Sequence, residues 1–283
     1  MRVENGHGKN KPNIRKFAEN DMADGFNSDG LDCESGGQKK TVKVGTRGSM
    51  LALAQTELVI KALKERFSQI DFQMITMSTR GDRDTSRALL EFGGKAVFVE
   101  EFEEAILKGD IDIAVHSAKD MPMEIMEGLT ISGTLPRACP QDVLIYKSGR
   151  SFDRNESFVV GTSSLRRQYQ IRDMYPYAVC KNLRGNVGTR IQKLEDGEYD
   201  AIILAAAGLE RLGVIEDKGN DSTECFEAHK DELTFRYIST ESMLPAACQG
   251  IIAIETRTSG EVYDMVRAIN DTEAVSYTHL RAH

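Results

Sequence analysis

Hydrophobic and polar residues follow two different periods along most of the chain, and the two periods take turns. Residues 41–46 alternate between polar and apolar at every second position, as a half-buried strand does. The same alternation, or a short unbroken apolar run, predicts strands at 70–78, 111–115, 129–134, 142–146, 158–160, 200–206 and 251–255. Apolar residues at helical spacing predict helices at 50–67, 97–108, 165–175, 209–212 and 260–270, with another opening near Thr189 and Arg190. Strands that alternate with helices are typical of parallel α/β sheets, so we predict an α/β fold.

Two stretches show neither the strand period nor the helix period. Residues 1–40 are rich in Gly, Asn and Asp and have no apolar pattern, which predicts a disordered leader. Residues 215–232 are acidic and aperiodic, and we interpret them as a surface insertion.

The remaining pattern predicts two domains. Pro136 and Pro140 indicate a crossing of the chain from one domain to the other. We therefore assign 41–135 plus 251–268 to a first domain and 141–244 to a second. Polar residues follow predicted strands in both halves, and ligands of parallel α/β sheets sit at the carboxyl ends of strands. The sequence thus predicts a cleft between two α/β domains.

The segment 161–190 concentrates positive charge in a chain whose formal net charge is −8 at pH 7. Its basic residues are Arg166, Arg167, Arg172, Lys181, Arg184 and Arg190, and they are accompanied by a single acidic residue. Thr162, Ser163 and Ser164 fall at a predicted strand-to-helix turn, where hydroxyls cap the helix and free N–H groups favour anions. Arginine adds forked donors that suit carboxylates or phosphates. A solvated basic helix face is the alternative, but two such clusters at strand ends favour a site for a ligand with several negative charges.

Composition restricts the class of protein. Hydrophobic residues make up 40% and charged residues 28% of the chain, which is ordinary for a globular protein. No run approaches the roughly 20 apolar residues of a membrane span, and no N-terminal block resembles a signal peptide. The five cysteines show no CxxC pair and no metal-like spacing with His, so we expect free thiols, no metal and a cytoplasmic location. The negative net charge and 7% aromatic residues argue against nucleic-acid binding.

Eight motifs, in order along 42–274, make the chain resemble hydroxymethylbilane synthase, also called porphobilinogen deaminase. They are VGTRGSMLALAQ, TRGD, GGKAVFVEE, DIAVHSAKDMP, VGTSSLRRQ, NLRGNVGTR, YDAIILAAAGLERL and LPAACQG. The family joins four porphobilinogen units head to tail, with loss of ammonia, to the linear tetrapyrrole hydroxymethylbilane of haem biosynthesis. The resemblance therefore implies a transferase that acts on a small molecule. It also implies two periplasmic-binding-protein-like domains, and we expect a monomer.

The resemblance implies which residues bind the substrate. Each pyrrole carries an acetate and a propionate, so a growing chain needs several arginine forks. The matching arginines are Arg47, Arg166, Arg167, Arg184 and Arg190. Further binding positions are Ser49, Lys95, Ser117, Thr162, Ser163, Ser164, Arg211 and Gln249.

Asp120 matches the catalytic aspartate of the family. Loss of ammonia from porphobilinogen leaves a cationic azafulvene, which a nearby aspartate stabilises while it moves protons at the pyrrole nitrogen. Lys119 would keep Asp120 ionised and hold a substrate carboxylate. From the residues alone, Asp120 could equally make a turn, His116 is more often a satisfied strand-end histidine, and Lys95 could be solvated.

The end of the chain departs from the family pattern. The family continues into a third α/β domain, whose cysteine carries a dipyrromethane primer through a thioether. Here Ala274 is followed by VSYTHLRAH, and no cysteine follows Cys248. We interpret 269–283 as the stub of a truncated third domain with a foreign tail from Val275, and expect the attachment cysteine to be absent. The activity of the chain as printed stays open, and a two-domain protein that binds anions or polypyrroles without catalysis is the alternative.

Overall fold

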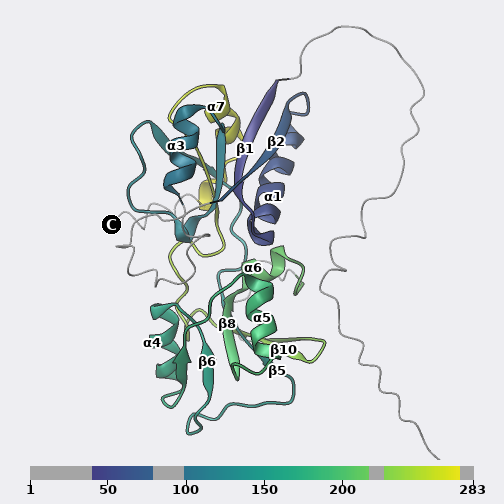
Figure 1. Cartoon of the computed structure of the whole chain (residues 1–283), viewed down its shortest axis with the longest axis vertical. Helices are drawn as coiled ribbons and strands as arrows, with labels where there is room; N and C mark the ends of the chain where they lie inside the picture. The colour runs from purple at the N-terminus through teal and green to yellow at the C-terminus, as the bar shows by residue number, and fades with distance from the viewer. Residues whose placement is uncertain (1–39, 79–98, 217–225, 275–283) are drawn as a thin grey trace, which may run out of the picture. The chain divides into compact units, whose positions relative to one another are not determined.

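The computed structural model describes residues 40–78, 99–216 and 226–274 (Figure 1). They form two β-sheets with helices packed on them, which is the α/β class that the sequence predicts. The leader predicted at 1–40 lies almost entirely outside these residues, and the tail from Val275 lies wholly outside them. No helix in the described segments is long and apolar enough to cross a membrane.

The first sheet has five strands in the order β2-β1-β3-β11-β4. They are β1 (Thr41–Arg47), β2 (Asp71–Met77), β3 (Ile113–Ser117), β4 (Leu129–Thr134) and β11 (Ile252–Arg257). The helices that pack on this sheet are α1 (Met50–Arg66), α3 (Glu100–Lys108) and α7 (Glu261–Ala268). Val42 and Val44 of β1 pack in one core cluster with Val59 and Leu63 of α1, so the alternation in β1 and the helical spacing in α1 meet at one interface.

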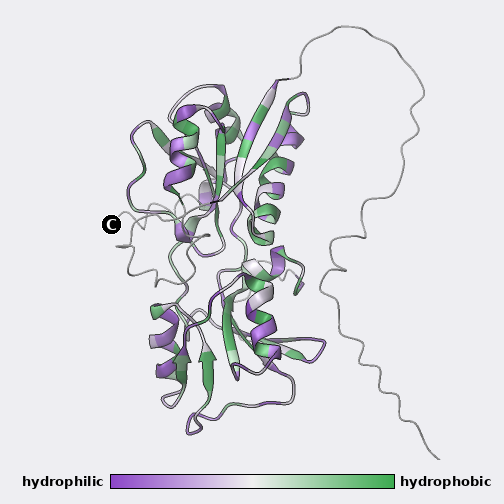
Figure 2. Ribbon diagram, viewed as in Figure 1, coloured by the Kyte–Doolittle hydropathy of each residue, from purple (hydrophilic) through white to green (hydrophobic). Residues whose placement is uncertain are grey.

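The second sheet has six strands in the order β7-β6-β8-β5-β10-β9. They are β5 (Asp142–Lys147), β6 (Val159–Gly161), β7 (Val179–Lys181), β8 (Ala201–Ala205), β9 (Glu227–Lys230) and β10 (Leu233–Ile238). The accompanying helices are α4 (Leu165–Met174), α5 (Val187–Glu195) and α6 (Ala206–Arg211). Val143 and Ile145 belong to one core cluster and Leu144 and Tyr146 to another, so β5 is buried on both faces. Figure 2 shows the hydrophobic character of strands such as β6 and β8 beside the more hydrophilic α4.

The expectation of parallel sheets is wrong for part of each sheet. Strand β11 runs antiparallel to both β3 and β4, and β5 runs antiparallel to β8 and β10. The pairs β1–β2, β1–β3, β6–β7 and β6–β8 are parallel. A strand buried on both faces is an apolar run in either orientation, so the hydrophobic pattern carried no information on direction. Each sheet draws its strands from one predicted domain, and the domain boundaries themselves stay a prediction.

The interpretation of 215–232 as an aperiodic insertion is wrong for part of that segment. Residues Glu227–Lys230 form β9, which pairs antiparallel with β10 at the edge of the second sheet. The strand β10 itself was not predicted. The side chains of β9 alternate between exposed and half-buried, so backbone pairing defines this strand although its sequence is polar. The part of the segment at 217–225 lies outside the described residues.

Candidate active site

The carboxyl end of β6 and the start of α4 place the first basic cluster. Ser164 caps α4, and its side chain accepts a hydrogen bond from the backbone N–H of Arg167 at 3.5 Å. Gly161 ends β6 close to Tyr199, because a Cβ at residue 161 would lie 2.8 Å from the tyrosine ring. The turn therefore brings Arg166 and Arg167 directly to the edge of the second sheet.

A second capped helix places Arg184 and Arg190. The side chain of Asn186 accepts from the backbone N–H of Thr189 at 2.8 Å, and α5 begins at Val187. The Nε of Arg190 donates to the carbonyl of Gly185 at 2.7 Å, so the arginine folds back over the turn that precedes the helix.

Neighbouring charges show that the two clusters are close in space. Burial lowers the pKa of Arg190, the positive charges of Arg167 and Arg184 lower it further, and Asp120 raises it. These four side chains interact although they come from three separate segments of the sequence.

Asp142 is a central residue of this site that sequence reasoning missed. Its Oδ1 accepts from the Nε of Arg167 at 3.0 Å and from the Nη2 at 2.7 Å, and its Oδ2 forms an ion pair with the Nη1 of Arg166 at 2.7 Å. The Nε2 of Gln249 also donates to Oδ1 at 3.0 Å. Asp142 is fully buried at the start of β5. The only signal in the sequence is an acidic residue at the first position of an apolar run.

The arginines keep Asp142 ionised in spite of its burial. Burial alone would raise the pKa of this carboxyl, but the charge and hydrogen bonds of Arg167, together with the charge of Arg166, hold the pKa below its usual range. Asp142 therefore places a buried negative charge inside a positive cluster at neutral pH.

Lys119 and Asp120 follow β3 in a short 3₁₀ turn (η3, Ala118–Asp120). Asp120 is exposed and Lys119 is half-buried. Burial lowers the pKa of Lys119, and the charges of Arg167 and Arg166 act in the same direction, while Asp120 and Asp142 raise it. The predicted lysine thus interacts electrostatically with the arginine pair, which the sequence separates from it by more than forty positions.

Several predicted binding residues take part in local structure. The hydroxyl of Ser163 donates to the carbonyl of Leu183 at 2.9 Å and accepts from its N–H at 3.1 Å, so it ties β6 to the segment before α5. The Oγ1 of Thr162 accepts from the N–H of Ser164 at 3.2 Å. These hydroxyls organise the turn, and a role in ligand binding stays a prediction.

Other predicted residues lie at the first sheet. Ser49 caps α1 by accepting from the N–H of Ala52 at 3.3 Å. Ser117 hydrogen bonds through its hydroxyl with the side-chain amide of Gln55. Arg47 is half-buried at the end of β1. A role of these three residues in ligand binding stays a prediction, and Lys95 lies outside the described residues.

Gln249 and Arg211 hold the segments that join the two sheets. The side-chain Nε2 of Gln249 donates to the carbonyl of Pro140 at 2.6 Å. The backbone carbonyl of Gln249 accepts from the Nε of Arg137 at 2.9 Å. The Nη2 of Arg211 donates to the carbonyl of Gly250 at 2.6 Å. Both residues therefore have a structural function that the sequence did not indicate.

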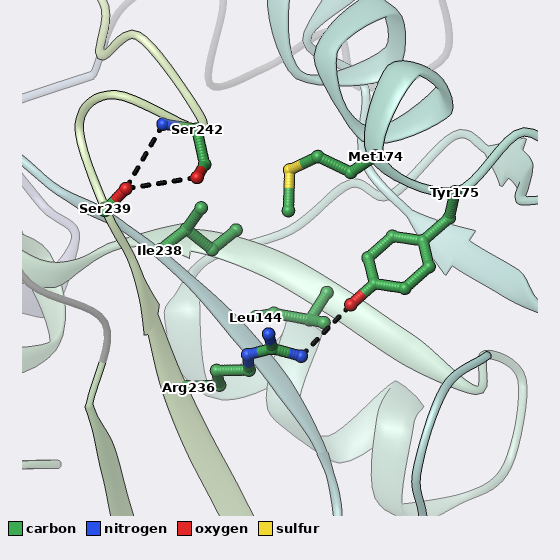
Figure 3. A pocket seen from close by; sticks show the side chains of 7 residues that line it. All are labelled: Leu144, Met174, Tyr175, Arg236, Ile238, Ser239 and Ser242. Carbon is green, nitrogen blue, oxygen red and sulfur yellow. Dashed lines mark hydrogen bonds between the residues drawn. The ribbon is translucent and has the colours of Figure 1, made fainter. Parts of the chain in front are cut away.

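His116 and a small pocket lie apart from the predicted chemistry. The Nε2 of His116 lies 3.0 Å from the Oε2 of Glu255 in a buried pair, as a satisfied strand-end histidine does. A cavity of about 120 Å³ near the end of α4 is lined by Leu144, Met174, Tyr175, Arg236, Ile238, Ser239 and Ser242 (Figure 3). Its polar groups pair with one another, since Arg236 donates to the hydroxyl of Tyr175 at 3.0 Å and the two serines bond at 3.1 Å. No group of three or more potential metal ligands occurs among the described residues.

The fold defines an α/β protein with a cluster of interacting cationic side chains. Residues 42–264 match the family model described as porphobilinogen deaminase, dipyromethane cofactor binding domain. The porphobilinogen deaminase of Streptococcus sanguinis is 40% identical over 240 residues, which cover 84% of this chain and 74% of that protein. The corresponding protein of Exiguobacterium sibiricum is 41% identical over 242 residues, again 84% of this chain and 74% of its own length. This chain belongs to the porphobilinogen deaminase family, which confirms the resemblance of its motifs.

Proposed function

We propose that this protein is a hydroxymethylbilane synthase, which joins four porphobilinogen units head to tail and releases ammonia. The observation that carries the proposal is the family match over 42–264, because this segment contains the whole arginine cluster together with Lys119 and Asp120. Each pyrrole unit brings an acetate and a propionate. A site in which cations outnumber acids is what such a substrate requires.

The residues present fit a dipyrromethane cofactor. Arg166, Arg184 and Arg190 are half-buried, so their guanidinium groups are shielded from solvent without being enclosed. We assign these three to the carboxylates of the cofactor and of the growing chain. When bound, the dipyrromethane supplies the pyrrole carbon from which the chain is extended.

Asp120 is the residue of this chain that we assign to the chemistry. Its exposed carboxylate lies at the end of a strand, and its charge interacts with those of Lys119 and Arg190. Loss of ammonia from porphobilinogen develops positive charge on the pyrrole, and a fixed carboxylate lowers the free energy of that state. Lys119 has a pKa below its usual range and is assigned to a substrate carboxylate.

Release of ammonia distinguishes this function from the alternative of a non-catalytic polypyrrole binder. Because no cysteine follows Cys248 in this sequence, the protein is prepared with a third domain of the family that carries the primer cysteine. It is mixed with porphobilinogen, binding is followed by titration calorimetry, and ammonia is measured in the same samples. Binding with ammonia release is the result expected of a deaminase. Binding without ammonia would favour the binding protein, and the absence of binding would contradict both.

We further propose that the protein acts as a monomer in the cytoplasm. The cysteines among the described residues form no disulfide, as is usual in a reducing compartment. Size-exclusion chromatography with light scattering tests the monomer, and a dimer mass would contradict it.

A further inference from the structure

One side of the Arg166 guanidinium is fixed by the protein. Its Nη1 forms the ion pair with the Oδ2 of Asp142 at 2.7 Å and donates to the carbonyl of Leu244 at 2.6 Å. These two contacts come from β5 and from the segment after β10, so they hold the group from two directions. The side chain of Arg166 remains 24% exposed.

The opposite edge of the same group is directed at no acceptor among the described residues. A guanidinium carries five N–H donors, and its Nε and Nη2 form a fork that matches the two oxygens of a carboxylate. In Arg166 both contacts with the protein are made by Nη1, so the Nε and Nη2 donors of the fork are not used in them. Arg167 differs, because its own fork is directed at the Oδ1 of Asp142 and its Nη1 donates to the carbonyl of Ile203 at 2.9 Å.

Asp142 is a rigid support for this arrangement. Its backbone lies in the middle of the sheet, paired with Ala205 on one side and Ile238 on the other. The amide of Gln249 fixes the carboxylate from a third direction at 3.0 Å. The hydrogen bonds to Oδ1 leave the buried carboxylate little freedom to move, so its Oδ2 presents a fixed negative charge to the Nη1 of Arg166.

We propose that Asp142 is a positioning residue, which holds Arg166 by Nη1 so that the Nε–Nη2 edge is presented to a carboxylate of the pyrrole substrate. The inference rests on the proposed function for the identity of that carboxylate. Asp142 itself does not touch the substrate; it acts through Arg166. Arg167 holds the carboxylate of Asp142 in place through its two hydrogen bonds to Oδ1.

A double-mutant cycle with porphobilinogen as the titrant tests the proposal. Asp142→Asn keeps the shape of the side chain but places an N–H or a neutral oxygen against Nη1, so affinity should fall about tenfold. Arg166→Lys removes the fork and should also cost about tenfold. Because both changes disable the same contact, the double variant should lose about tenfold and not about a hundredfold. A hundredfold loss, or an Asp142→Asn variant that binds as tightly as the parent or more tightly, would overturn the proposal.

A matched control tests whether loss of a carboxylate elsewhere in the second sheet also lowers porphobilinogen affinity. Asp200→Asn weakens the ion pair with Arg150 at the other end of β8, and it should leave porphobilinogen affinity within about twofold. If Asp142→Asn does not fold, Arg166→Lys still decides, because unchanged affinity in that variant would show that the fork is not used. A parent protein that does not bind porphobilinogen would refute the proposed function and this inference together, whereas every other outcome leaves the function standing.

Discussion

The Arg167 guanidinium is almost entirely enclosed by protein. It is 7% exposed, and its contacts are with both the side chain of Asp142 and the carbonyl of Ile203. A buried ion pair is costly to assemble, but removing one geometry-matched partner leaves the other charge poorly compensated. Arg167 therefore contributes to the stability of the second sheet as well as to the charge of the site.

We predict that Arg167→Lys lowers the free energy of unfolding by about 1–3 kcal/mol, because an ammonium cannot reproduce the three hydrogen bonds of the fork and Nη1. Urea denaturation followed by circular dichroism measures this change. Arg150→Lys at the partly exposed pair with Asp200 is the control and should cost no more than about 1 kcal/mol. Equal losses in the two variants would show that the Asp142 network adds no special stability.

The lowered pKa of Asp142 makes a further prediction about acid stability. A carboxyl whose native pKa lies below its unfolded value of about 3.9 stabilises the fold above that pH, and the stabilisation is lost as pH falls toward the native pKa. Below about pH 4 the unfolding free energy of the parent should therefore fall more steeply than that of Asp142→Asn, by up to about 1.4 kcal/mol per pH unit. Urea unfolding of the parent and of Asp142→Asn, measured from about pH 5 to about pH 3, compares their unfolding free energies across the unfolded pKa of the carboxyl. Parallel curves would mean that the carboxyl has an ordinary pKa in the native state.

Individual residues of the candidate site were predictable where they carry a local signal in the sequence or match a motif of the family. Arg166, Arg167 and Arg184 were found because basic residues gathered at strand ends. Asp142 was missed because a lone aspartate before an apolar run is common, and its partners lie about 25 and 107 positions away in the sequence. Such a contact depends on how the strands are ordered in the sheet, which a hydrophobic pattern does not specify.

Among the elements, the connection before β11 is the most tightly restrained. Gly250 has a φ of +91°, and a Cβ at this position would lie 2.3 Å from the carbonyl oxygen of Ala138. The backbone N–H of Ala138 donates to the carbonyl of Gly250 at 3.1 Å, so the two crossing segments are in direct contact. Only a residue without a side chain fits here.

We predict that Gly250→Ala destabilises the protein by two separable amounts. The left-handed backbone costs about 1–2 kcal/mol for any residue with a Cβ, and the close approach to Ala138 adds about 1–3 kcal/mol. Gly197→Ala isolates the first amount, because Gly197 has a φ of +81° and nothing within 4 Å of its added Cβ. Thermal unfolding of both variants gives the difference, and equal melting temperatures would contradict the predicted contact.

Most elements were predicted within a few residues, since their apolar spacing is regular. The strand at 129–134 has the bounds of β4, and the helix predicted at 165–175 is α4 with one residue fewer. The failures have a common cause. The orientation of β5 and β11, and the polar edge strand β9, depend on backbone pairing with strands distant in the sequence.

For the whole molecule, the distribution of charge matters more than its total. The formal net charge of the chain is −8 at pH 7. Five cationic side chains nevertheless interact electrostatically in one cluster, together with the carboxylates of Asp120 and Asp142. The cations are Lys119, Arg166, Arg167, Arg184 and Arg190. A local excess of positive charge attracts anions even when the net charge of the chain is negative. The sequence predicted this property because basic residues concentrate in 161–190, and the family resemblance added Lys119 and Asp120.

The rate of ammonia release by the Asp120→Asn variant tests most directly whether Asp120 and the arginine cluster form one active site. Asn keeps the size of the side chain and removes the negative charge, so porphobilinogen affinity should be retained. The rate of ammonia release should fall about 10²-fold or more, as expected when a charge that faces a developing cation is lost. Parent and variant both carry a third domain of the family with its primer cysteine, because no cysteine follows Cys248 in this sequence. Single-turnover measurements of ammonia release, each with its calorimetric affinity, give both quantities on one sample. A near-normal rate in Asp120→Asn, with unchanged affinity, would contradict the assignment of Asp120 to the chemistry.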